Sequence, residues 1–272
     1  MTNTNQRILS AIFMMLILIG FTMVGSQGIL ILLLIVGVLL IDEIVFHLLK
    51  IPRTHFGYYT SVISYIAGFY FHNYTTEGKV LVDPILNTAV LINISLLIYL
   101  FLEKMEQKSF MNLLTKFSFL TGFFVFIPMM SLCYVINDSR WLILTILLVA
   151  FNISVDTGAW FFGKKFGKKK LWPSISPKKT INGAIGGSIL SVIMASVISF
   201  FALGKLNIGI IFAFLILSCF AQLGDLIESK LKRQAGIKDS SNLIPGHGGI
   251  YDRVDSLIFV APFYVVVLKL FY

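Results

Sequence analysis

Nine long apolar runs restrict this chain to a fold built inside a membrane. A helix needs about 20 consecutive apolar residues to cross a bilayer, and most of the runs reach that length. Of the 272 residues, 57% are hydrophobic and 13% charged, unlike a soluble globular domain. We therefore expect an all-α, polytopic integral membrane protein of about nine transmembrane helices, the third being the least clearly defined. The runs cover residues 8–25, 27–49, 57–72, 84–102, 112–136, 141–163, 183–203, 207–228 and 255–271.

The basic residues predict how the chain is oriented. If all nine runs cross the bilayer, most of the 22 Lys and Arg residues fall on the same side as the N-terminus. Cytoplasmic loops are enriched in Lys and Arg, so we expect an integral protein of the cytoplasmic membrane with its N-terminus inside. The first run is longer than a usual signal peptide core, and no A-x-A-like cleavage site follows it, so it is predicted to be an uncleaved anchor.

The net charge of +9 is thereby interpreted as a cytoplasmic face. No basic module with interleaved aromatic residues and no zinc-ligand spacing indicates binding to nucleic acid. We expect one membrane domain over residues 1–272, with scaffold spans in 1–140 and a catalytic half in 141–272 that carries cytoplasmic loops at 164–182 and 229–254. In the scaffold, Asp42 and Glu43 face a polar cavity or end a span at the interface, and both alternatives stay open.

The first polar motif of the catalytic half surrounds the sixth run. Asn152 and Asp156 lie one helical turn apart, and a carboxylate within a span indicates a bound cation or an internal salt bridge. The Lys residues from 164 to 170 suit anchoring at the inner surface or attraction to anionic lipid. Gly183 and Gly187 form a small-xxx-small pair, which predicts a close helix contact.

The segment SPKKT, residues 176–180, is of a different kind. Pro177 is predicted to set a turn. Two ammonium groups follow it, on Lys178 and Lys179, between the hydroxyls of Ser176 and Thr180. This combination suits a polyphosphate at the membrane surface.

A polar stripe follows the end of the eighth run. Gln222, Asp225, Ser229 and Lys232 are spaced three, four and three apart, and Glu228 lies one turn from Asp225. They share one face of a helix. A solvated amphipathic helix would show the same pattern, but Asp225 follows a long apolar stretch, which favours a cation ligand.

A loop of turn residues and ionisable residues, NLIPGHGGIYDRVDS, precedes the last run at residues 242–256. Pro245 and Gly246 predict a turn, and Gly248 and Gly249 would let backbone N–H groups approach a phosphate. Asp252 and Asp255 lie three apart and point the same way. Acids that suit a helix dipole are the alternative, but that alternative leaves the nearby Lys238, His247 and Arg253 unexplained.

Carboxylates beside basic side chains favour metal-assisted phosphoryl or nucleotidyl transfer, because the acids hold cations that neutralise a transferring phosphate. A lipid phosphate and a soluble nucleotide would meet at the inner face.

The later motifs together resemble the signature of the phosphatidate cytidylyltransferases, also called CDP-diacylglycerol synthases. The resemblance extends over most of residues 150–260 and includes DTGAWFFGKKFGKKK, SPKKT, QLGDLIES and the run Ser229, Lys232, Arg233, Lys238, Asp239, Pro245, His247, Gly248, Gly249, Asp252, Arg253 and Asp255. One departure is Asn182, where members of the family commonly have Glu, so any role of that carboxylate is in doubt here.

The resemblance implies that CTP and phosphatidate react to CDP-diacylglycerol and pyrophosphate with Mg²⁺, a second cation being left open. It implies that Asp225 and Asp252 are the main ligands of the metal ions and that Asp156, Asp255 and Glu228 are supporting acids. The implied catalytic basic residues are Lys232, Arg233, His247 and Arg253. The implied substrate-binding residues are Ser176, Lys178, Lys179, Thr180, Ser229, Lys238, Gly248 and Gly249.

Three alternatives to this activity are weighed. A CTP-dependent lipid kinase or a CDP-archaeol synthase would share the metal chemistry but release CDP or use an ether lipid. A cation-coupled lipid transporter would spread its ionisable residues along the midplane of both halves, whereas here they gather at one end. A homodimer is left open.

Overall fold

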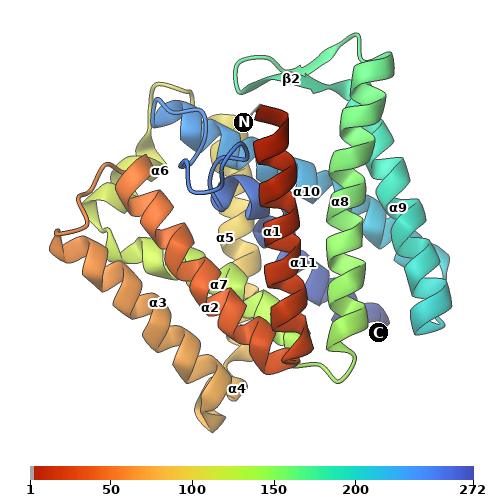
Figure 1. Ribbon diagram of the computed structural model, residues 1–272, viewed down its shortest axis with the longest axis horizontal. Helices are drawn as coiled ribbons and strands as arrows, with labels where there is room; N and C mark the ends of the chain where they lie inside the picture. Colours follow the sequence, from red (N-terminus) through yellow and green to blue (C-terminus); the bar gives the residue numbers. More distant parts are fainter. Residues whose placement is uncertain (1–2) are drawn as a thin grey trace. The chain divides into compact units, whose positions relative to one another are not determined.

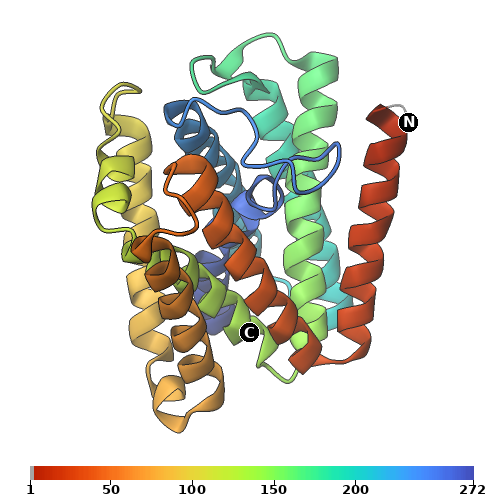
Figure 2. The same ribbon diagram turned by 60° about the vertical axis from the view of Figure 1, so that its left-hand side comes forward.

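A computed structural model describes residues 3–272, without the side chains of residues 3–5 and 79. Helices make up most of it, which confirms the predicted all-α membrane fold (Figures 1 and 2). In chain order the elements are α1 (Asn3–Met23), α2 (Ser26–Asp42), a π-helical turn η1 (Glu43–Leu48), α3 (Phe56–Tyr74), α4 (Thr76–Val80), α5 (Val82–Leu102), α6 (Ser109–Lys116), α7 (Phe119–Ile136), α8 (Trp141–Phe166), β1 (Lys170–Trp172), β2 (Ser176–Thr180), α9 (Ile181–Leu203), α10 (Ile208–Gln234) and α11 (Tyr251–Phe271).

Eight helices in the described part of the chain are long and apolar enough to cross a membrane. The third predicted run forms α3, whose 19 residues are sufficient in length. Its Tyr, Ser, Thr, His and Asn side chains lower its hydropathy below that of the other long helices. The predicted number of nine spans is therefore not confirmed, because eight helices of the described residues meet both the length and the hydropathy criterion.

The chain divides into two compact units. Met1–Asn137 and Lys230–Val254 form the first, and Asp138–Ser229 and Asp255–Tyr272 form the second. Both α10 and α11 thus contribute one end to each unit. The division of the chain into scaffold and catalytic halves at residue 140 stays a prediction.

In the first unit, α7 packs against α2, α3 and α5. Gly37 of α2 leaves room for the ring of Tyr65, whose hydroxyl donates to the Leu33 carbonyl at 2.9 Å. The buried Lys230, at the end of α10, donates from Nζ to the carbonyls of Tyr99, Leu100 and Glu103 at 2.7, 3.1 and 2.5 Å. It thereby satisfies the Leu100 and Glu103 carbonyls at the end of α5. It is also a second donor to the Tyr99 carbonyl, which already accepts from Glu103 N at 3.2 Å.

In the second unit, α8 and α9 lie side by side along their length (Figures 1 and 2). A Cβ placed on Gly187 would lie 2.6 Å from the Val155 carbonyl oxygen, and one on Gly183 would lie 2.7 Å from that of Ala159. Only glycine permits so close an approach of two backbones. The predicted close contact at Gly183 and Gly187 is confirmed.

The loop between α8 and α9 is an antiparallel hairpin in which Lys170 pairs with Thr180 and Trp172 with Ser176. The predicted turn at Pro177 is wrong: the turn falls on residues 173–175, which begin with Pro173. Pro177 lies within β2 instead. A proline is tolerated there because a strand in a two-stranded hairpin has one edge that needs no ladder hydrogen bonds.

Candidate active site

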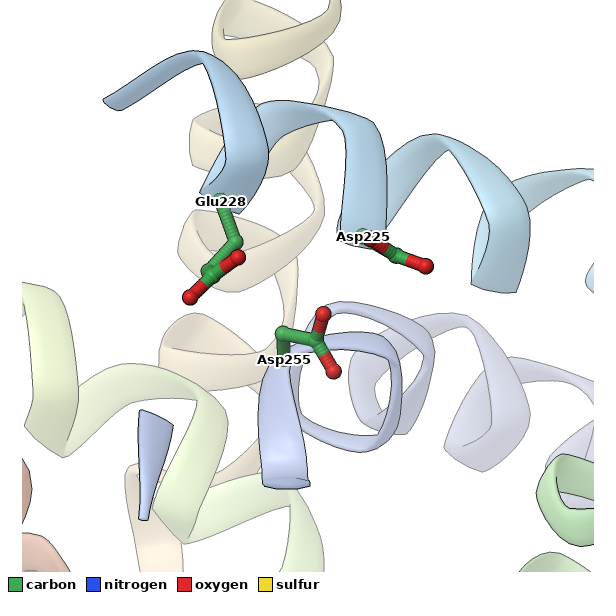
Figure 3. A group of neighbouring side chains, drawn as sticks. All are labelled: Asp225, Glu228 and Asp255. Atoms are coloured by element: carbon green, nitrogen blue, oxygen red, sulfur yellow. The ribbon is translucent and has the colours of Figure 1, made fainter. Parts of the chain in front are cut away.

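Three carboxylates of the second unit converge between α10 and α11 (Figure 3). Asp225 and Glu228 lie on the same face of α10 because they are three residues apart, and Asp255 reaches toward them from α11. One oxygen from each lies within 4.8 Å of the others. We call Asp225, Glu228 and Asp255 the acid cluster.

The hairpin supplies a cation to this cluster. Lys179 Nζ of β2 lies 2.5 Å from Asp225 Oδ2, and both side chains are partly exposed. Ser229, one turn along α10, donates from Oγ to Asp225 Oδ1 at 3.3 Å. The sequence predicted Lys179 and Ser229 as contacts of substrate, and both contact a proposed metal ligand.

A pocket of about 450 Å³ opens beside Asp225 within the second unit. Its polar lining includes Asp156 of α8, Lys178 and Lys179 of β2, and Gln222 and Asp225 of α10. Trp160, Ala159 and Leu171 give it apolar surface as well. The pocket therefore combines cationic and anionic groups with apolar walls.

Thr180, a predicted substrate contact, and Asn182, the departure from the family pattern, both have local structural contacts. Thr180 Oγ1 accepts a hydrogen bond from Gly183 N at 3.2 Å and so caps α9. Asn182 donates from Nδ2 to the Phe166 carbonyl at 2.8 Å, which ties the start of α9 to the end of α8. Ser176, at the start of β2, is partly exposed.

In the first unit, Asp252 is enclosed by donors. Its Oδ1 accepts from Lys232 Nζ. Its Oδ2 accepts from Ser240 N, Ser240 Oγ and Gly249 N at 2.8, 2.9 and 2.8 Å. The Asp252 side chain is 5% exposed. A buried carboxylate is stable there because each oxygen has a donor and Lys232 supplies the opposite charge.

We call residues 235–250, between α10 and α11, the signature loop. Gly248 has φ +85°, a left-handed conformation that suits glycine. A Cβ on Gly248 would lie 2.6 Å from Asp252 Oδ2, and one on Gly249 would lie 2.5 Å from Glu43 Oε1. Both glycines therefore make room for carboxylates of the chain itself, and their predicted contact with a phosphate stays a prediction.

The sequence left the surroundings of Glu43 undecided. It is 2% exposed, and its carboxylate accepts from Ser241 Oγ and Ile250 N on Oε1 and from Ser240 Oγ and Tyr251 N on Oε2. Its neighbour Asp42 instead pairs with Arg53, with 2.7 Å between Asp42 Oδ1 and Arg53 Nε. Glu43 therefore lies in a buried polar network, and the alternatives of a polar cavity and a span end at the interface stay predictions.

Helix α1 contacts the turn of the signature loop. Arg7 Nε donates to the Gly246 carbonyl at 3.0 Å, and Ser10 Oγ lies 2.8 Å from His247 Nδ1. Partial burial, together with the positive charges of Arg253 and Arg7, lowers the pKa of His247 below its usual value. The imidazole is therefore mainly neutral at pH 7, which suits hydrogen bonding better than charge neutralisation.

The remaining predicted basic residues, Arg233, Lys238 and Arg253, are exposed. Arg233 donates from Nη1 to the Ile237 carbonyl at 3.0 Å. The expected metal pair, Asp225 and Asp252, belongs to different units, so its joint action stays a prediction. Sequence reasoning missed Ser240, Ser241 and Ser10, because short hydroxyl residues beside a turn resemble ordinary loop residues.

The chemistry of the acid cluster fits a divalent cation. Mg²⁺ prefers oxygen ligands and is usually held by one or two carboxylates together with water and phosphate. Three carboxylates so close to one another repel unless their charge is offset by a basic side chain, as Lys179 does at Asp225, by a metal ion or by bound protons. The cluster is therefore a candidate metal site.

The sequence was compared with protein families and with known proteins, and it matches one family and several named relatives. The profile described as "Cytidylyltransferase family" matches residues 5–271. The phosphatidate cytidylyltransferase of Bacillus subtilis is 51% identical over 121 residues, which are 43% of this chain and 44% of that protein. The Staphylococcus haemolyticus protein of the same name is 44% identical over 184 residues, 67% of this chain and 69% of that protein. The one from Staphylococcus aureus strain COL is 46% identical over 162 residues, 56% and 61% of the two chains. The matched stretch thus covers less than two thirds of two of these three relatives.

Proposed function

This chain belongs to the cytidylyltransferase family, and on that premise we propose that it transfers the cytidylyl group of CTP to phosphatidate. The products would be CDP-diacylglycerol, for phospholipid biosynthesis, and pyrophosphate. The names of the relatives that it resembles support this substrate pair. The observation that carries the proposal is the acid cluster beside a pocket lined by Lys178 and Lys179.

The bond changes need no covalent intermediate on the protein. An oxygen of the phosphatidate phosphate, which is already anionic, attacks the α-phosphorus of CTP. A new P–O bond forms as the bond from the α-phosphorus to the oxygen that bridges it to the β-phosphorus breaks. The electron pair of the broken bond leaves with pyrophosphate. Catalysis is then a matter of positioning and charge neutralisation.

A divalent cation, Mg²⁺ in this proposal, would be held by Asp225, Glu228 and Asp255 and would neutralise charge that develops on the phosphates. Asp156 faces the same pocket and supports this site. A contribution of Asp252 to it is part of the proposal, as the resemblance implies, and so is a second cation.

The basic residues have two sets of roles in this proposal. Lys178 and Lys179 bind phosphate oxygens of the nucleotide, because both line the pocket and Lys179 already contacts the acid that would bind the cation. Lys232 keeps Asp252 ionised and in place. Lys238, Arg233 and Arg253 are exposed and attract the anionic substrates. His247 donates or accepts a hydrogen bond at the turn of the signature loop.

Position-specific labelling of CTP tests the reaction. The purified protein is given Mg²⁺, phosphatidate and CTP labelled at either the α- or the γ-phosphorus. We expect the α-label in the lipid product and the γ-label in pyrophosphate. Transfer of the γ-label to lipid with release of CDP would establish a lipid kinase instead. An ether-linked acceptor, supplied in place of phosphatidate, separates a CDP-archaeol synthase from the proposed enzyme.

A further inference from the structure

We propose that Glu43 is a positioning residue that holds the signature loop and the start of α11 in their active arrangement. The inference rests on the proposed function, because that function assigns roles to Asp252 and Arg253, which directly follow the signature loop in the chain. Glu43 hydrogen-bonds to Ser240, Ser241, Ile250 and Tyr251, none of which is a predicted catalytic or substrate-binding residue. It acts through the loop that leads to such residues.

Four hydrogen bonds carry the argument. The hydroxyls of Ser240 and Ser241 donate to Glu43 at 2.9 and 2.7 Å. The backbone N–H groups of Ile250 and Tyr251 donate to it at 2.8 Å each. One carboxylate therefore binds two places, ten residues apart in sequence: the loop at Ser240 and Ser241, and the junction of the loop with α11 at Ile250 and Tyr251.

The bonds to Ile250 and Tyr251 also form a cap. These two N–H groups lie at the start of α11, where a helix has no internal acceptors for its first N–H groups. A carboxylate at that end is favoured by the helix dipole as well. Glu43, from a helix about 200 residues earlier in the chain, thus does what a local capping residue usually does.

A shared hydroxyl links Glu43 to Asp252. Ser240 Oγ lies 2.9 Å from Glu43 Oε2 and 2.9 Å from Asp252 Oδ2. A hydroxyl has one hydrogen, so it donates to one of these carboxylates at a time. Loss of the Glu43 charge would therefore change the hydrogen bonding of Ser240 and, through it, the position of Asp252.

The backbone at Glu43 departs from a regular α-helix. Glu43 opens the π-helical turn η1, in which the Leu49 N–H reaches back five residues to the Ile44 carbonyl at 2.9 Å. Such turns are rare and frequently mark functional sites. In the signature loop, Gly249 leaves space for this carboxylate, since a Cβ there would lie 2.5 and 2.6 Å from the two Glu43 oxygens.

The test measures loop mobility and turnover in the same full-length protein. A nitroxide label is placed at Asn242→Cys, an exposed loop position, in a Cys219→Ser background, since Cys133 is buried. Glu43→Gln is compared with Asp42→Asn, the matched control. Asp42 is the adjacent carboxylate and bonds to Arg53 and Tyr58 instead of the loop.

We expect a more mobile label and a kcat lowered about 10- to 100-fold in Glu43→Gln, because small displacements of catalytic groups have effects of this size. Asp42→Asn should leave both unchanged. Unchanged mobility in Glu43→Gln would overturn the positioning role, whatever the activity. A mobile loop with wild-type kcat would overturn its link to catalysis.

A milder variant keeps the test valid if Glu43→Gln does not fold. Ser241→Ala removes one donor to Glu43 together with the acceptor of the Leu243 N–H, and it leaves the contacts of Asp252 in place, so both readouts should move in the same direction by a smaller amount. No change in either would overturn the proposal. If the wild-type protein transfers no cytidylyl group, the proposed function fails, whereas the mobility comparison still judges the role of Glu43 in holding the loop.

Discussion

At the residue scale, two carboxylates of the predicted site have very different surroundings. Asp252 has four donors within hydrogen-bond distance in the first unit, one of them Lys232 and one the Ser240 hydroxyl that it shares with Glu43. Asp255 lies instead among carboxylates, near Asp225 and Glu228. The sequence predicted that these acids have related roles because they lie three residues apart on one helix. The spacing could not reveal which of them would meet a lysine and which would meet other acids.

We predict that Asp255→Asn separates activity from stability. Removing a ligand should lower kcat by about 100-fold or more, the size of effect seen when one preorganised electrostatic contact is lost. Removing one of three clustered charges should leave the melting temperature in EDTA unchanged or raise it, because repulsion falls. Activity assays and thermal unfolding in detergent measure the two effects.

The control for this prediction is Asp138→Asn. Asp138 is paired with Arg140 at 3.2 Å, outside the acid cluster, so its loss should leave kcat unaltered. A strongly lowered melting temperature for Asp255→Asn in EDTA would contradict the metal-ligand role and indicate a structural one. Asp225→Asn should lose activity as well, although it also leaves Lys179 without its partner.

At the element scale, the sequence predicted contacts of short range best. The glycine pair at 183 and 187 predicted a close helix contact, because small residues at helical spacing commonly pack helices together in membranes. The structure shows that the partner is α8. The hairpin was less readable. Either Pro173 or Pro177 could lie in the turn, and the sequence alone does not show which. The strand pairing of the structure places Pro173 in the turn and Pro177 in β2. Glu43 was undecided because its partners lie about 200 residues away.

The α8–α9 contact gives a prediction at this scale. Gly187→Ala should lower the melting temperature, since its Cβ would lie 2.6 Å from the Val155 carbonyl oxygen and overpacking typically costs about 1–3 kcal/mol. The matched control is Gly20→Ala in α1, where a Cβ would meet nothing within 4 Å. That variant should be neutral or stabilising, because alanine favours helix more than glycine does. Equal melting temperatures for the two variants would show that the contact is loose.

At the scale of the whole molecule, hydropathy predicted a polytopic fold and most of its spans. The count of spans was harder, because α3 is long enough to cross a bilayer but carries many polar and Tyr side chains. The predicted orientation depended on an odd number of spans. Within the second unit, however, the two ends of α8 can be tested directly.

We predict that the hairpin end of α8 faces the cytoplasm. A membrane-impermeant maleimide should label Ser139→Cys in intact cells and Lys168→Cys only after permeabilisation, each in a Cys219→Ser background. Both positions are exposed and flank α8 at opposite ends. The physical reason is the cluster of Lys residues after α8, which favours the inner side. The reverse labelling pattern would place the pocket outside, where CTP is not supplied.

The buried carboxylate of Glu43 also has a consequence for biosynthesis. Its last partner, Tyr251, lies 208 residues further along the chain. At about 5–20 residues per second, a ribosome needs about 10–40 s to make that stretch. During this interval the acid has entered with its helix but its final hydrogen-bond donors do not yet exist, and an unpaired carboxylate in hydrocarbon is costly. Because Glu43 lies five residues before the end of the span Ser26–Leu48, we expect headgroup water to solvate it until translation is almost complete.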